Sequence, residues 1–130
     1  MTDSLFDRGL AARKAVLGSE YVEKSLAQAD EFSRPLQELV TEYCWGAIWT
    51  REGLPRKTRS LLNLAMLATL NRQHELKLHV MGALRNGCTQ QEIQEALLQA
   101  TIYAGVPAGV EAFRTARAAI EEYRAAPATK

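Results

Sequence analysis

Glu75 and His79 are the two side chains in this sequence whose types and spacing best suit proton transfer. They lie four residues apart in a stretch with helical periodicity, so both face the same side of a helix. A carboxylate beside an imidazole can fix the tautomer of the ring and raise its pKa, which makes a proton donor or acceptor near neutral pH. The same spacing also occurs in surface pairs on amphipathic helices, and spacing alone leaves both interpretations open.

A cluster of cations precedes this pair in the sequence, around the loop at residues 50–54 and the start of the helix expected after it. Its members are Arg51, Arg56, Lys57 and Arg59. Several cations at a helix N-terminus form a site suited to a carboxylate. A solvated surface with ordinary ion pairs has the same composition, so the cluster alone does not decide between the two.

Trp45 and Trp49 lie one helical turn apart, and together they would form a flat apolar wall. Such a wall suits a binding site for a ring, but it is equally typical of a core or a subunit interface.

His74 and His79 are five residues apart and point to different helix faces, so they do not form a zinc site. Cys44 and Cys88 are far apart in the sequence, and we expect two inert, buried thiols.

The elements that must position these residues are helices, because helical periodicity runs through almost the whole chain and strand alternation is nearly absent. Gly18, Asn86–Gly87 and Gly105 indicate helix ends, and Thr89 with Glu92 forms a capping box. One apolar face is expected over 36–47. The run 61–70 is apolar nearly all round, which predicts a fully buried helix, and 71–73 need not interrupt it. We expect one all-α domain over 1–130 with about six or seven helices, including N-terminal helices in 1–30 and a frayed tail at 125–130.

Composition places the chain among ordinary soluble globular proteins. Its 130 residues include 16 Lys and Arg against 15 Asp and Glu, which gives a formal net charge of +1. This balance provides no long-range field for nucleic acid or an anionic membrane. The N-terminus has no basic and apolar leader, and no apolar run approaches the roughly 18 residues that span a bilayer. We therefore expect a cytoplasmic protein that binds neither nucleic acid nor membrane.

Taken in order, these short motifs resemble the carboxymuconolactone decarboxylase family, within the AhpD-like superfamily. The resemblance runs from Arg8-Gly9-Leu10 to about Ala112. The segments that carry it are Trp45-Gly46 with Trp49, Arg51 with Gly53-Leu54-Pro55, Arg59-Ser60-Leu61, Glu75-Leu76 with His79, Asn86-Gly87, Glu92, and Tyr103-Ala104-Gly105 with Pro107-Ala108. The resemblance implies an AhpD-like helical bundle. It also implies a homo-oligomer, often a hexamer built as a trimer of dimers.

The resemblance further implies decarboxylation of 4-carboxymuconolactone to the enol-lactone of 3-oxoadipate and carbon dioxide, in the protocatechuate branch of the β-ketoadipate pathway. The lactone carbonyl of that substrate accepts the electron pair left by carbon dioxide, so no cofactor or metal is expected. In this interpretation His79 donates the proton, and Glu75 orients the imidazole or relays the proton. Arg59 and Arg51 hold a carboxylate or the oxyanion. The ring lies against the aromatic side chains Trp45, Trp49 and Tyr103.

Three alternatives remain open at this point. A thiol peroxidase of the AhpD type carries two cysteines three apart and a histidine four residues further on. Placing that histidine on His79 puts the cysteine positions at Arg72 and Glu75, so both thiols are missing. A family member with a different lactone or keto acid as substrate is the second alternative. A helical interaction module without catalysis is the third.

Overall fold

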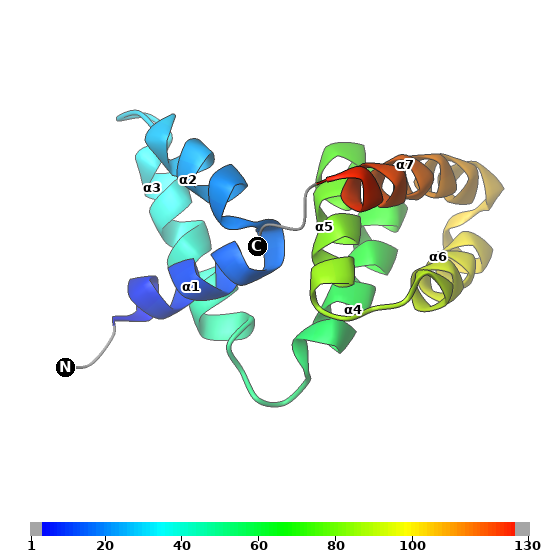
Figure 1. Cartoon of the computed structure of the whole chain (residues 1–130), viewed down its shortest axis with the longest axis horizontal. Helices are drawn as coiled ribbons and strands as arrows, with labels where there is room; N and C mark the ends of the chain where they lie inside the picture. The colour runs from blue at the N-terminus through cyan, green and yellow to red at the C-terminus, as the bar shows by residue number, and fades with distance from the viewer. Residues whose placement is uncertain (1–3, 127–130) are drawn as a thin grey trace. The chain divides into compact units, whose positions relative to one another are not determined.

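A computed structural model describes residues 4–126 as helices joined by short loops, which confirms the all-α prediction. The chain divides into two compact units, and Figure 1 shows the helices of each. Unit 1 comprises the described residues up to Leu54, and unit 2 begins at Pro55. No helix in the described part of the chain is long and apolar enough to cross a membrane.

Unit 1 contains α1 (Leu5–Leu17), α2 (Ser19–Ala27), α3 (Arg34–Leu39) and the π-helix η1 (Val40–Ile48). Gly18 ends α1 at a φ of 94°, as its sequence position predicted. The main contact within the unit is between α1 and η1. Their backbones nearly touch, because a Cβ built on Gly46 would lie 2.6 Å from the Leu5 carbonyl oxygen and one built on Gly9 would lie 2.8 Å from the Gly46 nitrogen.

The apolar face expected over 36–47 is not the buried side of this segment. In a π-helix the N–H of residue i donates to the carbonyl of residue i−5, as Trp49 does to Cys44 at 3.1 Å. Each turn therefore holds more residues than an α-helical turn, and the buried positions shift to Thr41, Trp45 and Gly46. The side chains of Leu36, Leu39 and Tyr43 are more than half exposed.

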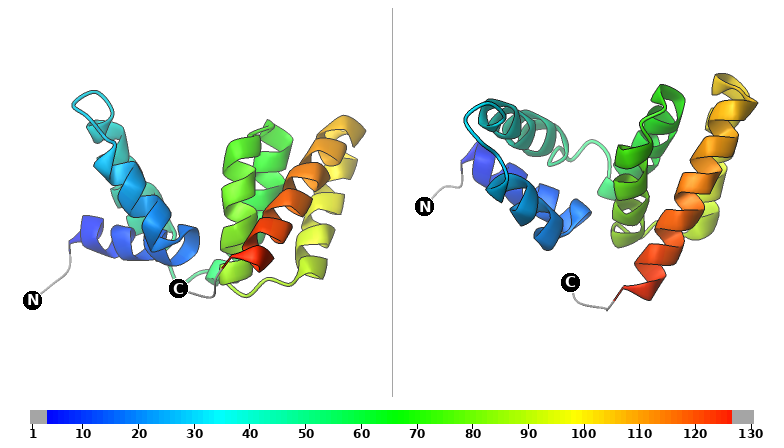
Figure 2. Two further views of the ribbon diagram at one scale, coloured as in Figure 1. Left: turned by 45° about the horizontal axis from the view of Figure 1, so that its top comes forward. Right: turned by 90° about the horizontal axis from the view of Figure 1, so that it is seen from above.

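Unit 2 is a bundle of α4 (Arg56–Leu70), α5 (Gln73–Arg85), α6 (Gln90–Ala104) and α7 (Val106–Ala125). Helix α4 packs on α5 and α6, and α7 packs on the same two helices from the other side; both views in Figure 2 show this arrangement. The core is aliphatic, with Leu64, Leu76, Val80, Ile93 and Leu97 almost fully buried. The predicted capping box at the start of α6 is confirmed, since the Glu92 N–H donates to Thr89 Oγ1 at 3.0 Å and the Thr89 N–H donates to the Glu92 carboxylate at 2.9 Å.

Two further expectations for this region are corrected by the structure. Asn71 adopts a left-handed conformation at φ 60°, which ends α4, so 71–73 do interrupt the helix. Helix α4 is not fully buried within the chain either, since Leu62, Met66 and Leu70 are about half exposed or more. Each helix of a four-helix bundle has only one stripe facing the core, so an apolar opposite stripe remains uncovered by the same bundle. Helix α7 includes Ala125, and residues 127–130 of the predicted tail lie outside the described residues.

Candidate active site

Glu75 and His79 lie on α5, as predicted, in its first turn and near its middle. Contacts between polar side chains help to hold this helix against α7. The Thr115 hydroxyl donates to the Gln73 side-chain oxygen, and Lys77 forms an ion pair of 2.8 Å with Glu122. The Glu75 carboxylate is exposed, whereas the His79 imidazole is mostly buried beside the core residue Val80.

Burial decides the protonation of His79. Desolvation disfavours the imidazolium and lowers the pKa of His79 to about 4, while the Glu75 carboxylate acts in the opposite direction with a smaller effect. The sequence interpretation, in which the carboxylate raises the pKa, is therefore wrong in its net sign. In the free protein at neutral pH, His79 is a neutral imidazole, which is a proton acceptor.

Arg59 occupies the first turn of α4 and is partly buried. Next to it, the fully buried Ser60 hydroxyl accepts a hydrogen bond of 2.8 Å from the Asn86 side-chain amide. This bond ties the start of α4 to the end of α5. His79 precedes Asn86 by seven residues, or about 10 Å along a helix axis. Arg59 and His79 thus lie on neighbouring antiparallel helices at different heights of the bundle.

Trp45 and Trp49 lie inside unit 1 and are both almost fully buried. Their rings stack with centroids 4.7 Å apart and an interplanar angle of 19°. Arg51 is exposed in the loop after η1, where its backbone N–H donates to the Ile48 carbonyl at 3.1 Å. These three residues belong to unit 1, whereas Arg59, Glu75 and His79 belong to unit 2. That they serve one substrate stays a prediction.

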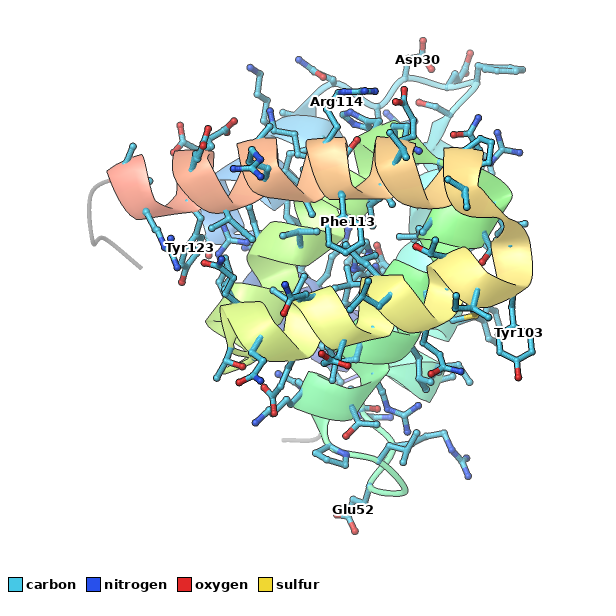
Figure 3. All side chains as sticks on the ribbon, turned by 90° about the vertical axis from the view of Figure 1, so that its right-hand side faces the viewer. Asp30, Glu52, Tyr103, Phe113, Arg114 and Tyr123 are labelled. Carbon is cyan, nitrogen blue, oxygen red and sulfur yellow. The ribbon has the colours of Figure 1, made fainter. Side chains whose placement is uncertain are left out.

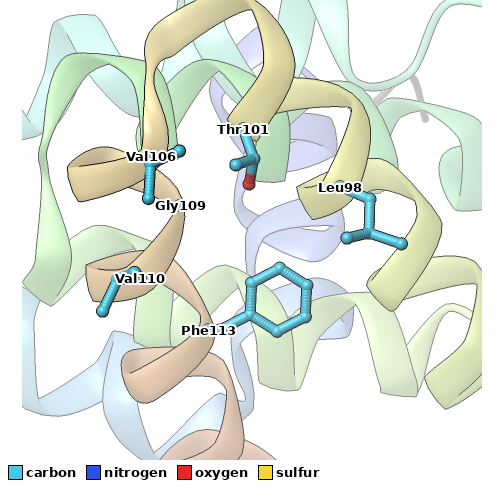
Figure 4. Close-up of a pocket in the computed structure, with 6 residues that line it drawn as sticks. All are labelled: Leu98, Thr101, Val106, Gly109, Val110 and Phe113. Atoms are coloured by element: carbon cyan, nitrogen blue, oxygen red, sulfur yellow. The ribbon is translucent and has the colours of Figure 1, made fainter.

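Tyr103 lies at the end of α6, where 84% of its side chain is exposed. Figure 3 shows it extending outward from α6, whereas Phe113 on α7 points between the two helices. Beside Phe113 is a groove of about 300 Å³ that the sequence interpretation did not include, and Figure 4 shows its lining residues: Leu98, Thr101, Val106, Gly109, Val110 and Phe113. The lining contains no titratable group, so the groove offers a binding surface and no acid–base chemistry.

The cysteines differ from each other. Cys88 is buried as expected: its thiol donates to the Lys57 carbonyl at 3.5 Å, and burial raises its pKa. Cys44 is exposed, which corrects the expectation of two buried thiols. Among residues 4–126, no three side chains of the His, Cys, Asp and Glu types are grouped closely enough to hold a metal ion.

Sequence reasoning missed one further charged residue. Arg13 is a buried cation in unit 1, although its position in the sequence, surrounded by polar and apolar residues of α1, resembles that of a surface arginine. The only signal was the small residue Gly9, which lies one turn earlier on the same helix face. Such a glycine permits close helix contact, but it does not reveal which partner it contacts.

Comparison with known proteins shows the family of this chain. Residues 34–118 match the model of the carboxymuconolactone decarboxylase family. The chain is 53% identical over 108 residues to the nitrosuccinic acid decarboxylase of Metarhizium robertsii, covering 83% of this chain and 76% of that protein. It is 37% identical over 122 residues to the 4-carboxymuconolactone decarboxylase of Acinetobacter baylyi, covering 94% of this chain and 91% of that protein. The helical chain described above therefore belongs to the carboxymuconolactone decarboxylase family.

Proposed function

We propose that this protein decarboxylates a small dicarboxylic acid in which an electron-accepting group can take up the electron pair left by the departing carboxylate, with nitrosuccinic acid as the first candidate substrate. The sequence identity of 53% to a decarboxylase of that acid supports this choice. The structural observation that carries the proposal is His79, an imidazole held largely out of water on α5.

The reaction needs an electron sink, and the substrate contains one. When the C–C bond to the carboxylate breaks, carbon dioxide leaves and its bonding pair stays on the carbon. In nitrosuccinic acid the adjacent nitro group takes up this pair as a nitronate, and a proton added to the carbon gives 3-nitropropanoate. One proton is consumed for each carbon dioxide released. The protein must therefore bind the acid, stabilise the developing oxyanion and deliver that proton.

His79 is suited to deliver it. The imidazole is neutral in the free protein, but a dicarboxylate bound beside it favours the charged ring, because an opposite charge counteracts the desolvation. The ring then takes up a proton as the substrate binds. Once carbon dioxide has left and the negative charge has moved to carbon, the buried imidazolium is a strong acid and transfers its proton there. Glu75, four residues earlier on α5, orients the ring.

Arg59 is the proposed partner for a substrate carboxylate or for the developing oxyanion. Its planar guanidinium can form two parallel hydrogen bonds to either group. It lies in the first turn of α4, where the unpaired backbone N–H groups of the helix also favour negative charge.

A second candidate substrate is 4-carboxymuconolactone, whose lactone carbonyl accepts the electron pair as a dienolate. The sequence identity of 37% to a decarboxylase of that lactone favours this substrate, because the match extends over 94% of this chain. Thiol peroxidase chemistry is not proposed, since Arg72 and Glu75 occupy the positions of the two AhpD cysteines.

The test is carbon dioxide release from each purified acid, followed for the wild type and three variants. His79→Ala should slow turnover about a hundredfold or more, the usual scale for a lost general acid. Glu75→Gln should slow it less, and substrate binding should change little in either. His74→Ala is the matched control, because His74 is exposed on the same helix and points away from that face. Equal, small effects of the two histidine variants on folded protein would contradict the role of His79.

A further inference from the structure

Arg13 is the buried cation of unit 1, with only 6% of its surface exposed. It follows Gly9 by one turn on α1, where the backbones of α1 and η1 come into contact. This close approach encloses the guanidinium between the two helices. The burial of Arg13 is thus a consequence of the close contact at Gly9.

The hydrogen bonds of this guanidinium are incomplete. Nη1 donates to Oγ1 of Thr41 on η1 at 3.1 Å, and that hydroxyl is itself fully buried. Nε is buried and has no acceptor. No carboxylate in the described part of the chain forms an ion pair with Arg13. The ionisable groups that act on it are the Tyr21 phenol and the Cys44 thiol, and neither is a carboxylate.

A buried charge is normally paired, because removal of an ion from water costs more than one neutral hydrogen bond returns. Lysine or histidine can escape this cost by losing a proton. Arginine keeps its charge under all ordinary conditions, so it needs an anion. The structure of unit 1 therefore contains a cation whose natural counter-charge is not supplied by the described part of the chain.

The geometry of the guanidinium indicates where that anion binds. The Nε–H and one Nη2–H point in parallel from one edge of the plane, and they can donate to the two oxygens of a carboxylate. Nη1, on the other side, is held by Thr41. We propose that Arg13 is a carboxylate-binding residue, in which the Nε and Nη2 edge pairs with the carboxylate of a small organic acid while Thr41 fixes the opposite side.

This proposal rests on the proposed function only for the choice of ligand, because a decarboxylase of dicarboxylic acids binds carboxylates. It requires no turnover, so it can be tested by binding alone. Succinate is the probe, and succinamide, which has the same length and no charge, is the matched control ligand.

The experiment follows the Nε–H resonance of Arg13 by ¹H–¹⁵N NMR, assigned from the Arg13→Met variant in which it is missing. Succinate should shift this resonance to higher proton frequency as the charge-assisted bond forms, whereas succinamide should leave it in place. By calorimetry, Arg13→Met should weaken succinate binding at least tenfold. Arg117→Met, which removes an exposed arginine of α7, should leave the affinity unchanged.

A second measurement separates this role from a purely structural one. If Arg13 is kept for a ligand, Arg13→Met should raise the unfolding temperature of the ligand-free protein, because it replaces an unpaired buried charge by an apolar chain. Succinate should then protect the wild type against heat and not the variant. An Arg13→Met protein that is less stable and binds succinate as tightly as the wild type would overturn the proposal, as would an unshifted Nε–H at saturation.

Discussion

In unit 2 the imidazole of His79 is withdrawn from water, and in unit 1 the guanidinium of Arg13 is withdrawn further. Burial shifts both pKa values downward, but the consequences differ. With a pKa of about 4, His79 is uncharged at neutral pH and needs no counter-ion. Arg13 remains charged and holds one hydroxyl as its hydrogen-bond partner. Desolvation thus leaves His79 neutral and able to accept a proton. Arg13 stays charged and, in our proposal, binds an anion.

The two residues also differ in the kind of packing that surrounds them. Unit 2 has a continuous aliphatic core, and most of its helix contacts are made by side chains. In unit 1 the contact between α1 and η1 is made by the backbones at Gly9 and Gly46, beside the buried Thr41. An aliphatic core can adjust to a changed side chain by small shifts. A backbone contact has no such freedom, so the position of Arg13 depends on two glycines.

The largest expected effect is that of Gly9→Ala. The new Cβ would overlap the Thr41 carbonyl and lie 2.8 Å from the Gly46 nitrogen, and neither backbone atom can rotate away. We expect a loss of about 3 kcal/mol or more in the free energy of unfolding, as for severe overpacking, measured by urea denaturation.

Gly53→Ala is the control, because a Cβ at Gly53 has no heavy atom within 4 Å. Its unfolding free energy should stay within about 0.5 kcal/mol of the wild type, the usual range for surface substitutions. Similar unfolding curves for the two alanine variants would contradict the view that unit 1 is held by a backbone contact.

The next effect is the dependence of stability on pH that arises from His79. Unfolded, the imidazole binds a proton near its usual pKa of 6.5, and folded it does so only near 4. Between these values the unfolded state binds more protons, so the free energy of unfolding falls as the pH falls from about 6.5 to 4. The expected loss from this residue is on the order of 3 kcal/mol.

His79→Gln should remove this contribution, which is measured as the difference between the pH profiles of the two proteins in urea denaturation. Added succinate should raise the pKa of His79 in the wild type, followed by the NMR signal of its ring carbon. Identical pH profiles for the wild type and His79→Gln would show that the imidazole is not desolvated as described.

A smaller effect is expected on self-association, which stays a prediction for this protein. Leu98 on α6 and Val106 and Val110 on α7 line the apolar groove and are exposed, and Ile102 on α6 is exposed as well. No charged residue occurs between 98 and 110. An uncharged apolar surface of this kind can pack against the same surface of a second copy of the chain, because no like charges meet at the twofold axis.

Ile102, which is 79% exposed, is the residue to change. Ile102→Glu should weaken the oligomer about tenfold or more in light scattering over a concentration series, since two carboxylates would have to be desolvated at the contact. Ala118→Glu adds the same charge at an exposed position of α7 away from the groove, and the mass of the oligomer should not change. A wild-type protein that is monomeric at micromolar concentration would contradict the prediction of a homo-oligomer.

Local signals in the sequence determined much of this protein. Gly18, the capping box of Thr89 and Glu92, and Gly105 mark helix ends through interactions within a few residues, and they are found where predicted. The spacing of Glu75 and His79 on one helix follows from the helical repeat alone. The ordered motifs were enough to identify the family, which the comparisons confirm.

Only the tertiary structure decided the features that depend on contacts distant in the sequence. The π-helix η1 buries Thr41, Trp45 and Gly46, whereas most of the apolar residues expected on one face over 36–47 are exposed, and Arg13 is buried where Gly9 contacts η1. The sign of the His79 pKa shift changed for the same reason. The sequence shows which charge is four residues away, whereas desolvation is the sum over all the side chains that exclude water. Burial is a property of the packed units, and no local pattern contains it.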